Sequence, residues 1–181
     1  VLFRSLWSAE FTKADLTEAV FQNAKLDLSI FVGANLLQAS MDGASGRGLD
    51  FTGASLWKAK LRKVMFMEIT CERTDMKDVL ACEAVLDRAR GNGVQLTHAD
   101  LAKASLQEAE LESADLHEAH LKSTDFSRAS LRDADLTKAT LAHVCLKAAD
   151  LRGVRGVDRE LLAKHSGDLS EAVFDGPYPV T

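Results

Sequence analysis

Large apolar residues recur at every fifth position of this chain, from Leu6 to Leu151. Counting from 6 to 151 in steps of five gives 30 centres, of which 18 are Leu, six are Phe and two are Met. The four exceptions are Gly46, Cys71, Ala81 and Gly91. The position two residues before each centre is usually small, and it is Ala at 20 of the 30 places. The chain therefore has a fixed five-residue pattern without insertions.

This period excludes a long helix and a continuous strand. Five residues advance an α-helix by about 500°, so successive centres would lie ~140° apart and could not share one face. In a strand the side chains alternate, and an odd spacing would send successive centres to opposite faces. The small residue and the centre are two apart, however, so both can point inward from a short extended segment. The other two residues of each repeat must then turn a corner.

An extended segment followed by a corner, repeated many times, predicts a coil with flat sides and an apolar interior. Backbone groups of one coil can pair with the coils on either side at ~4.8 Å, which satisfies donors and acceptors except at the two ends. Repeats of this kind need neighbours for stability, so the chain is expected to be a solenoid. The number of sides per coil does not follow from the period.

Four segments carry a resemblance to a known family: ADLAK at 99–103, ADLHE at 114–118, ADLTK at 134–138 and ANL at 34–36. They resemble the A(D/N)LXX motif of the pentapeptide repeat proteins. The resemblance implies an all-β fold, a right-handed quadrilateral parallel β-helix with four repeats per coil. Thirty repeats divided by four would give seven and a half coils, or about 36 Å at ~4.8 Å per coil.

The pattern also predicts the domain organisation and the buried positions. Residues 1–153 are expected to form the rod, and residues 154–181 a C-terminal cap. The cap would contain a short helix at 158–165, with Asp158 capping its start and Gly167 capping its end, followed by two repeats in a shifted frame. Leu161 and Leu162 of that helix would cover the open core. The representative core residues are Leu16, Leu56, Leu101, Leu116, Leu136, Ala114 and Ala134.

The repeat is weakest between 64 and 95, where two interpretations stay open. The inward small position grows as the centres shrink, which a close-packed core would need. Alternatively, apolar residues at presumed outward positions mark a protein partner or dimer surface. With four sides per coil, Leu37 and Trp57 would stack in one outward column, whereas Trp7 is assigned to an end cap. The candidate partner surface comprises Leu37, Trp57, Met65, Met67, Leu80 and Val85.

Catalytic and metal chemistry find little support in the sequence. It contains no nucleophile elbow, phosphate loop or dinucleotide fingerprint. His117, His120 and His143 would project outward and diverge from one another, which disfavours a metal site. Three cysteines without metal-type spacing disfavour both a zinc site and a disulfide framework. We therefore expect no enzyme activity, no cofactor and no metal.

Three functional hypotheses follow. The first is a protein-interaction or scaffold module that uses the faces of the rod. The second comes from the quinolone-resistance branch of the family, whose members resemble B-form DNA and bind DNA gyrase or topoisomerase IV. That mechanism needs broad acidity, whereas the net charge here is only −5, and the outward positions sum to −4 on the side of Leu116 and Leu136 and to +2 on the next side. The third is a domain of a larger bacterial protein of the secretion-associated or effector type.

The remaining expectations concern partners and location. The sequence contains no stripe of Lys or Arg residues, so direct nucleic-acid binding is not expected. No apolar run has the ~20 residues of a membrane span. Without a visible export signal, the expected location is the cytoplasm, or outside the cell by a signal-peptide-independent route for an effector. An uncovered coil end would favour a homodimer, since it leaves a strand edge open.

Overall fold

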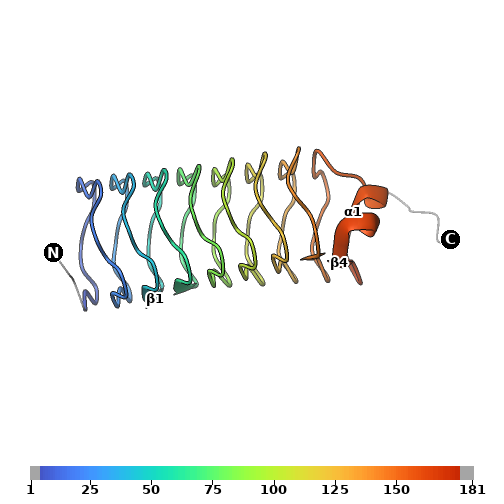
Figure 1. Ribbon diagram of the computed structural model, residues 1–181. Helices are drawn as coiled ribbons and strands as arrows, with labels where there is room; N and C mark the ends of the chain where they lie inside the picture. The colour runs from blue at the N-terminus through green and yellow to red at the C-terminus, as the bar shows by residue number, and fades with distance from the viewer. Residues whose placement is uncertain (1–4, 176–181) are drawn as a thin grey trace.

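The computed structural model describes residues 5–175 and shows a rod of stacked coils (Figure 1). Parallel bridges join residues 20 apart, from Ser5 with Lys25 to Asp135 with Arg155, so that one coil takes four repeats. The predicted fold, a quadrilateral parallel β-helix, is confirmed. Residues 1–4 and 176–181 of the predicted rod and cap lie outside the described residues.

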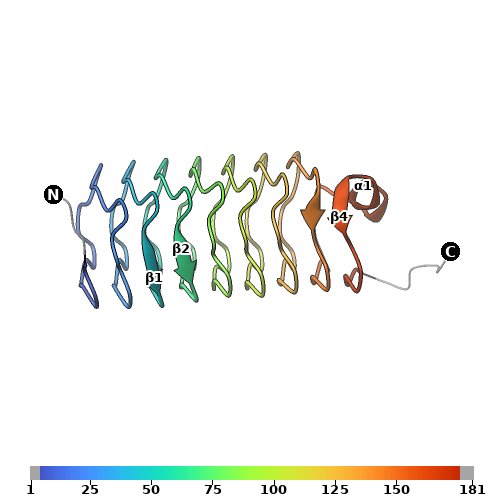
Figure 2. The same ribbon diagram turned by 60° about the horizontal axis from the view of Figure 1, so that its bottom comes forward.

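Few segments are long enough to form strands. β1 (Ser45–Arg47) pairs in parallel with β2 (Met65–Met67), and β3 (Val144–Cys145) pairs in parallel with β4 (Ser166–Asp168). The single helix of the described part, α1 (Arg159–His165), lies at the C-terminal end of the rod (Figure 2). No helix within residues 5–175 has the length and apolar character that a bilayer crossing requires.

The four faces are numbered here by an outward residue of the same coil. Face 1 carries Lys25, face 2 Ile30, face 3 Asn35 and face 4 Ser40, and each residue pairs with the equivalent position 20 residues on. An edge is named by the two faces that it joins. Edge 1–2 therefore follows face 1 along the chain, and edge 3–4 lies across the rod from it.

Four of the five amides in each repeat donate to backbone carbonyls, three of them to neighbouring coils, as residues 35–39 illustrate. The amide of Asn35 donates to Ala14 of the preceding coil (2.9 Å), while Leu36 and Gln38 donate to Ser55 and Trp57 of the next coil (2.7 and 2.9 Å). Ala39 closes the corner by donating to the carbonyl of Leu36 (2.9 Å). The amide of Leu37 has no backbone acceptor and donates instead to Oδ1 of Asn35 (3.2 Å).

This arrangement explains the Asp or Asn of the motif. The amide directly after the centre points away from the ladder, and an Asp or Asn directly before the centre accepts from it. At four other corners the acceptor stands one coil earlier, as where Asp27 accepts from Arg47 (3.1 Å). The residues that accept within their own repeat are Asp15, Asn35, Asp50, Asp75, Asp100, Asp115, Asp125, Asp135, Asp150 and Asp168.

The corners restore the inward direction that an odd repeat would otherwise lose. The second corner residue has positive φ, from 52° at Ser8 to 71° at Gly153. Non-glycine residues occupy most of these positions although the left-handed region costs them about 1 kcal/mol each. The ladder on both sides of the corner offsets this cost, so that the strained turn recurs throughout the rod.

The core follows the predicted two-in-five pattern. Leu56, Leu101, Leu116, Leu136, Ala114 and Ala134 are buried. Leu16 is only partly buried because it belongs to the first described coil, which has a neighbour on one side only. Within one column Phe11, Phe31 and Phe51 stack at 4.9 Å between successive ring centroids.

Two shrunken centres, Cys71 and Gly91, continue the column of stacked Phe rings. A Cβ on Gly91 would meet Cys71 Sγ at 2.9 Å, and the cavity beside them measures only about 10 Å³. Val94 and Ile69, at the inward small positions, line that cavity and fill most of the lost volume. The interpretation of this zone as a repacked core therefore accounts for its interior.

Gly46 is compensated in the same way. A Cβ there would lie 2.6 Å from Leu49 Cδ1, so Leu49 occupies the space that a large centre would take. β1 runs from Ser45 to Arg47 around this small centre and pairs with β2 in register. The small centre at Gly46 therefore does not break the coil.

The C-terminal end differs from the sequence-based expectation in two details. Asp158 Oδ1 accepts from the amide of Leu161 (2.7 Å) at the start of α1, and Leu162 is fully buried. Leu161, however, is 39% exposed and does not cover the core. Gly167 does not end the helix either, because the chain passes directly from His165 into β4. Gly167 lies within β4, and its φ is not left-handed. The next residue, Asp168, accepts a hydrogen bond from the amide of Leu146.

Beyond α1 the coil resumes in a shifted register. Asp150 pairs with Val173, 23 residues on, instead of the usual 20. Leu169, Ala172 and Phe174 pack against the core. The helix has added three residues to this coil, which explains why the five-residue count fails after Leu151.

We expect Leu116→Ala to lower the free energy of unfolding by about 2–5 kcal/mol, since it opens a cavity in a close-packed core. The control is Lys122→Ala on the exposed surface, which should change stability by less than ~0.5 kcal/mol. Urea unfolding followed by circular dichroism measures both. Equal effects of the two substitutions would contradict the assigned register.

The corner carboxylates should make the rod sensitive to acid. Hydrogen bonds from Thr17 and Thr137, first from the hydroxyl and then from the amide, lower the pKa values of Asp15 and Asp135 below 3.8. When folding lowers the pKa of a carboxyl group, its ionised form stabilises the fold at pH values above the pKa of the unfolded chain. This contribution is lost as the pH falls through about 4 and below. Urea midpoints between pH 6 and pH 3 should therefore fall.

Asp135→Asn keeps the acceptor but no longer titrates, so its acid-induced loss should be smaller than that of the wild type. Glu110→Gln, at an exposed carboxyl of face 2, serves as the control and should follow the wild-type curve. An Asp135→Asn curve that also coincides with the wild type would contradict the proposed role of this carboxylate.

Candidate interaction surface

The predicted partner-surface residues do not form one patch. Leu37 and Trp57 lie in one column on edge 3–4, as expected, but Leu80 lies on face 4. Met65 and Val85 pair on face 1, and Met67 ends β2 on edge 1–2. The structure therefore brings together only Met65, Met67 and Val85, and we propose that the first two of these contribute to a partner surface.

Trp57 is held by polar contacts along edge 3–4. Its Nε1 donates to Asp78 Oδ2 (2.8 Å), and Lys58 Nζ lies 4.6 Å from the centroid of its ring. The same edge continues with His98 between Asp78 (3.4 Å) and Glu118 (3.2 Å). The indole N–H of Trp57 therefore already has an acceptor, and Lys58 covers part of its ring. We assign Trp57 to a network of polar surface contacts.

A larger apolar surface lies on and beside edge 1–2 in the first four coils, within residues 5–67. Its members are Trp7, Leu28, Met65 and Met67, with 72%, 52%, 58% and 42% of their surfaces exposed. We call these four residues the apolar edge. The sequence analysis placed Trp7 in an end cap and did not single out Leu28, whereas the structure places both on edge 1–2.

Leu28 could have been found from the sequence. It occupies the second corner position, where it has a φ of 58°. Among the described residues with positive φ it is the only large apolar one, since the others are polar, charged, Gly or Ala. A Leu at a solvent-facing corner in an otherwise polar set indicates a surface role, because packing does not require it there.

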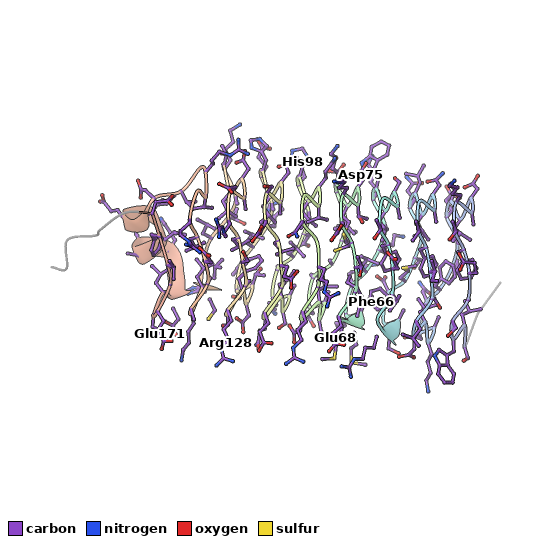
Figure 3. The ribbon with its side chains drawn as sticks, turned by 180° about the vertical axis from the view of Figure 1, so that it is seen from behind. Phe66, Glu68, Asp75, His98, Arg128 and Glu171 are labelled. Atoms are coloured by element: carbon purple, nitrogen blue, oxygen red, sulfur yellow. The ribbon has the colours of Figure 1, made fainter. Side chains whose placement is uncertain are left out.

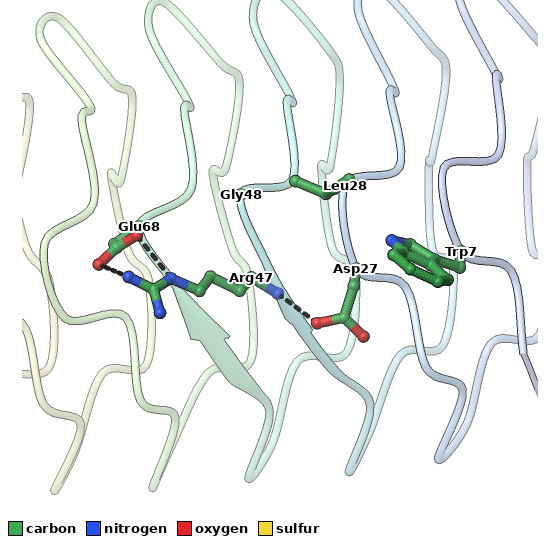
Figure 4. Close-up of a pocket in the computed structure, with 6 residues that line it drawn as sticks. All are labelled: Trp7, Asp27, Leu28, Arg47, Gly48 and Glu68. Carbon is green, nitrogen blue, oxygen red and sulfur yellow. Dashed lines mark hydrogen bonds and ion pairs between the residues drawn. The ribbon is translucent and has the colours of Figure 1, made fainter.

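A groove lined by six residues, two of which belong to the apolar edge, lies between the first coils (Figure 4). Trp7 and Leu28 form apolar walls, and Gly48 leaves room between them and the next coil. A Cβ on Gly48 would already lie 3.0 Å from Leu28 Cδ2. The lining residues are Trp7, Asp27, Leu28, Arg47, Gly48 and Glu68.

An ion pair closes one end of this groove. Arg47 donates from Nε and Nη2 to the carboxylate of Glu68 at 2.7 and 2.6 Å. These hydrogen bonds raise the pKa of Arg47 and lower the pKa of Glu68. Because the geometry is bidentate, the pair fixes both side chains against the rod and directs the guanidinium away from Asp27.

From Glu68 to Arg128, edge 1–2 carries a ladder of alternating charges. Arg88 lies between Glu68 (3.6 Å) and Glu108 (2.9 Å), and Arg128 lies 3.6 Å from Glu108. Figure 3 shows Glu68, Arg128 and Glu171 along this edge, with His98 on the other side of the rod. The two parts of the edge therefore differ: the N-terminal part is apolar, and the part from Glu68 to Arg128 carries charges that pair with one another.

The titratable groups give no sign of acid–base or metal chemistry. Within residues 5–175, every carboxyl group with a shifted pKa is shifted downward, whereas a general acid needs a raised value. Burial raises the pKa of Cys71 to about 12. In the same part of the chain, no three His, Cys, Asp or Glu side chains come together as metal ligands.

The stacked coils and their repeated corners define a solenoid repeat protein. A sequence model described as pentapeptide repeats matches in eight copies, over residues 5–31, 29–66, 92–128 and 114–153. The chain belongs to the pentapeptide repeat family. The unmatched segment, 67–91, contains the shrunken centres Cys71 and Ala81 and ends at Gly91, yet the coil continues through it.

Several solved structures resemble the chain. HetL, a protein involved in the regulation of heterocyst differentiation in Nostoc sp. strain PCC 7120, is 26% identical, with 94% of this chain and 87% of HetL covered and a TM-score of 0.41. Full-length QnrB1, a plasmid-mediated fluoroquinolone resistance protein, is 16% identical, with 97% and 93% covered and a TM-score of 0.42.

A pentapeptide repeat protein from the thylakoid lumen of Arabidopsis thaliana is 21% identical, with 64% of this chain and 72% of that protein covered and a TM-score of 0.43. No curated protein matches this chain. The repeat match identifies the family.

Proposed function

We propose that this chain is a non-enzymatic binding module that docks a protein partner on the apolar edge. The observation that carries the proposal is the exposure of Trp7 and Leu28 on the first two coils of edge 1–2, and of Met65 and Met67 on and beside the same edge two coils further along. Large apolar residues that gather on one surface of a soluble fold mark interaction sites more often than scattered ones do. Tryptophan and methionine are also enriched in the centres of protein interfaces.

The arrangement fits an interface in which an apolar centre is bordered by fixed charges. The Arg47–Glu68 pair lies beside Leu28 and Gly48, and Arg88 extends the charged border along the edge. Paired charges at the border add little affinity, but they disfavour partners with mismatched charge. A few apolar residues would then supply most of the binding energy, as is usual for protein interfaces.

DNA mimicry toward gyrase or topoisomerase IV remains the alternative function. It requires acidic contact faces, whereas Glu68 and Glu108 on edge 1–2 and Glu118 on edge 3–4 are paired with Arg or Lys. The acidic residues of face 3 also serve the corners, where Asp115 and Asp135 accept backbone amides. These pairings favour the apolar edge as the binding surface.

The test is affinity capture from a lysate of the source organism, followed by titration of the purified partner. Leu28→Ser should raise the dissociation constant at least tenfold, because truncation of a central interface residue costs more than about 1.4 kcal/mol. Leu80→Ser is the control, since Leu80 is also an exposed apolar residue but lies on face 4. It should leave the constant within twofold of the wild type.

Loss of binding with Leu80→Ser and not with Leu28→Ser would contradict the proposed surface. A gyrase supercoiling assay with the wild-type protein accompanies the titration. Inhibition that survives Leu28→Ser would favour the alternative function.

A further inference from the structure

The groove on the apolar edge contains a carboxylate without a cationic partner. Asp27 Oδ1 accepts from the backbone amide of Arg47 (3.1 Å), but no Lys, Arg or His of residues 5–175 forms an ion pair with it. Asp42, which plays the same backbone role on edge 4–1, is paired with Arg62 at 2.7 Å. The guanidinium of Arg47 is occupied by Glu68 (Figure 4).

Trp7 adds a second feature that suits a cation. It lies one coil before Asp27 in the same edge column and lines the same groove, with 72% of its surface exposed. The face of an indole ring attracts Lys and Arg. The protein's other tryptophan shows a cation in this position, since Lys58 Nζ lies 4.6 Å from the centroid of the Trp57 ring. At Trp7 the described residues supply a ring and an acid, and no cation is placed over that ring.

We propose that this groove recognises a peptide segment of a protein partner that carries Lys or Arg close to a large apolar side chain. The cation lies between the ring of Trp7 and the carboxylate of Asp27. The apolar side chain packs against Leu28 over Gly48. This inference rests on the proposed function and specifies the chemistry of the partner.

The spacing along the rod fits such a segment. The cation site lies between the first and second coils and the apolar site between the second and third, so their centres are about one coil, or ~5 Å, apart. Side chains at positions i and i+2 of an extended peptide project on the same side about 6.6 Å apart. A base and an apolar residue separated by one residue therefore match the two sites.

The first experiment is selection of random 12-residue peptides displayed on phage against the immobilised wild-type protein. Gly48→Asn serves for counter-selection, because an Asn side chain fills the groove while Asn tolerates the positive φ of 68°. Its matched control is Gly53→Asn in the same coil, where φ is 64° and no atom lies within 4 Å of the added Cβ. Retained binding by Gly53→Asn separates filling of the groove from strain in the corner.

We expect the selected peptides to pair Lys or Arg with Leu, Ile, Phe, Met or Trp within three residues. The synthetic form of the most enriched peptide is then titrated calorimetrically at 50 mM salt. Gly48→Asn should remove binding, and Gly53→Asn should bind within twofold of the wild type. Asp27→Asn keeps the acceptor for the Arg47 amide but loses the charge, and should weaken binding at least fivefold.

Asp87→Asn is the control for Asp27→Asn. Asp87 occupies the same edge column and accepts from Gln107 as Asp27 accepts from Arg47, but it lies outside the groove. This variant should bind like the wild type. Equal weakening by both substitutions would overturn the role of Asp27.

The remaining outcomes separate this inference from the proposed function. If the selected peptides are apolar, carry no base and bind the wild type but not Gly48→Asn, the inference is overturned. The apolar edge then still stands as a docking surface. Peptides that bind Gly48→Asn and Leu28→Ser as well as the wild type would overturn both. Failure to select any groove-dependent peptide also overturns the inference, whereas the docking surface is decided by the Leu28→Ser titration of the natural partner.

Discussion

The structure depends on one interaction, the parallel backbone ladder between residues 20 positions apart. Each coil donates forward and backward, as Leu36 does to Ser55 and Asn35 to Ala14. The ladder fixes four repeats per coil and aligns the centres in columns, so that the Phe rings stack. It also requires a corner with positive φ after every extended segment. Side-chain burial, corner chemistry and the outward surface all follow from this register.

The ladder leaves one amide in five without a backbone acceptor, and this requirement explains the polar half of the motif. Asp or Asn before the centre accepts from that amide at ten corners, and an Asp or Asn one coil earlier does so at four more. These carboxylates are therefore structural, although they lie at the surface. Face 3, whose outward column includes Asp115 and Asp135, is acidic for this reason, and its charge alone does not indicate a DNA-like binding face.

The interior could be predicted from the sequence because two positions in five face a single core. The period identified the centres, and the exchange of volume around Cys71 and Gly91 was visible as larger residues at the inward small positions. The end of the helix was not predictable in the same way. Gly167 has the residue type of a helix cap, but pairing of β4 with β3 determines its conformation. Only Leu162 of the Leu161–Leu162 pair points into the core, since neighbouring residues of a short helix face different directions.

The outward surface was harder to predict because adjacency depends on position within the coil as well as on composition. Met67 and Leu80 are both apolar and close in sequence, yet they lie on an edge and on a different face. The hydrogen bond of Trp57 to Asp78 depends on a side-chain rotamer that no periodicity reports. Leu28 is the exception, because a large apolar residue at a left-handed corner stands out once the five positions are aligned.

The most direct test of this account is amide hydrogen exchange measured residue by residue by NMR. We expect protection with a period of five over residues 21–150, in which the amide directly after each centre exchanges faster than the other four. Corners capped by Asp or Asn, such as Leu37 and Thr137, should exchange more slowly at that position than uncapped corners. Protection without this period, or equal exchange of the amide after the centre and its neighbours, would contradict the ladder on which the rest of the structure depends.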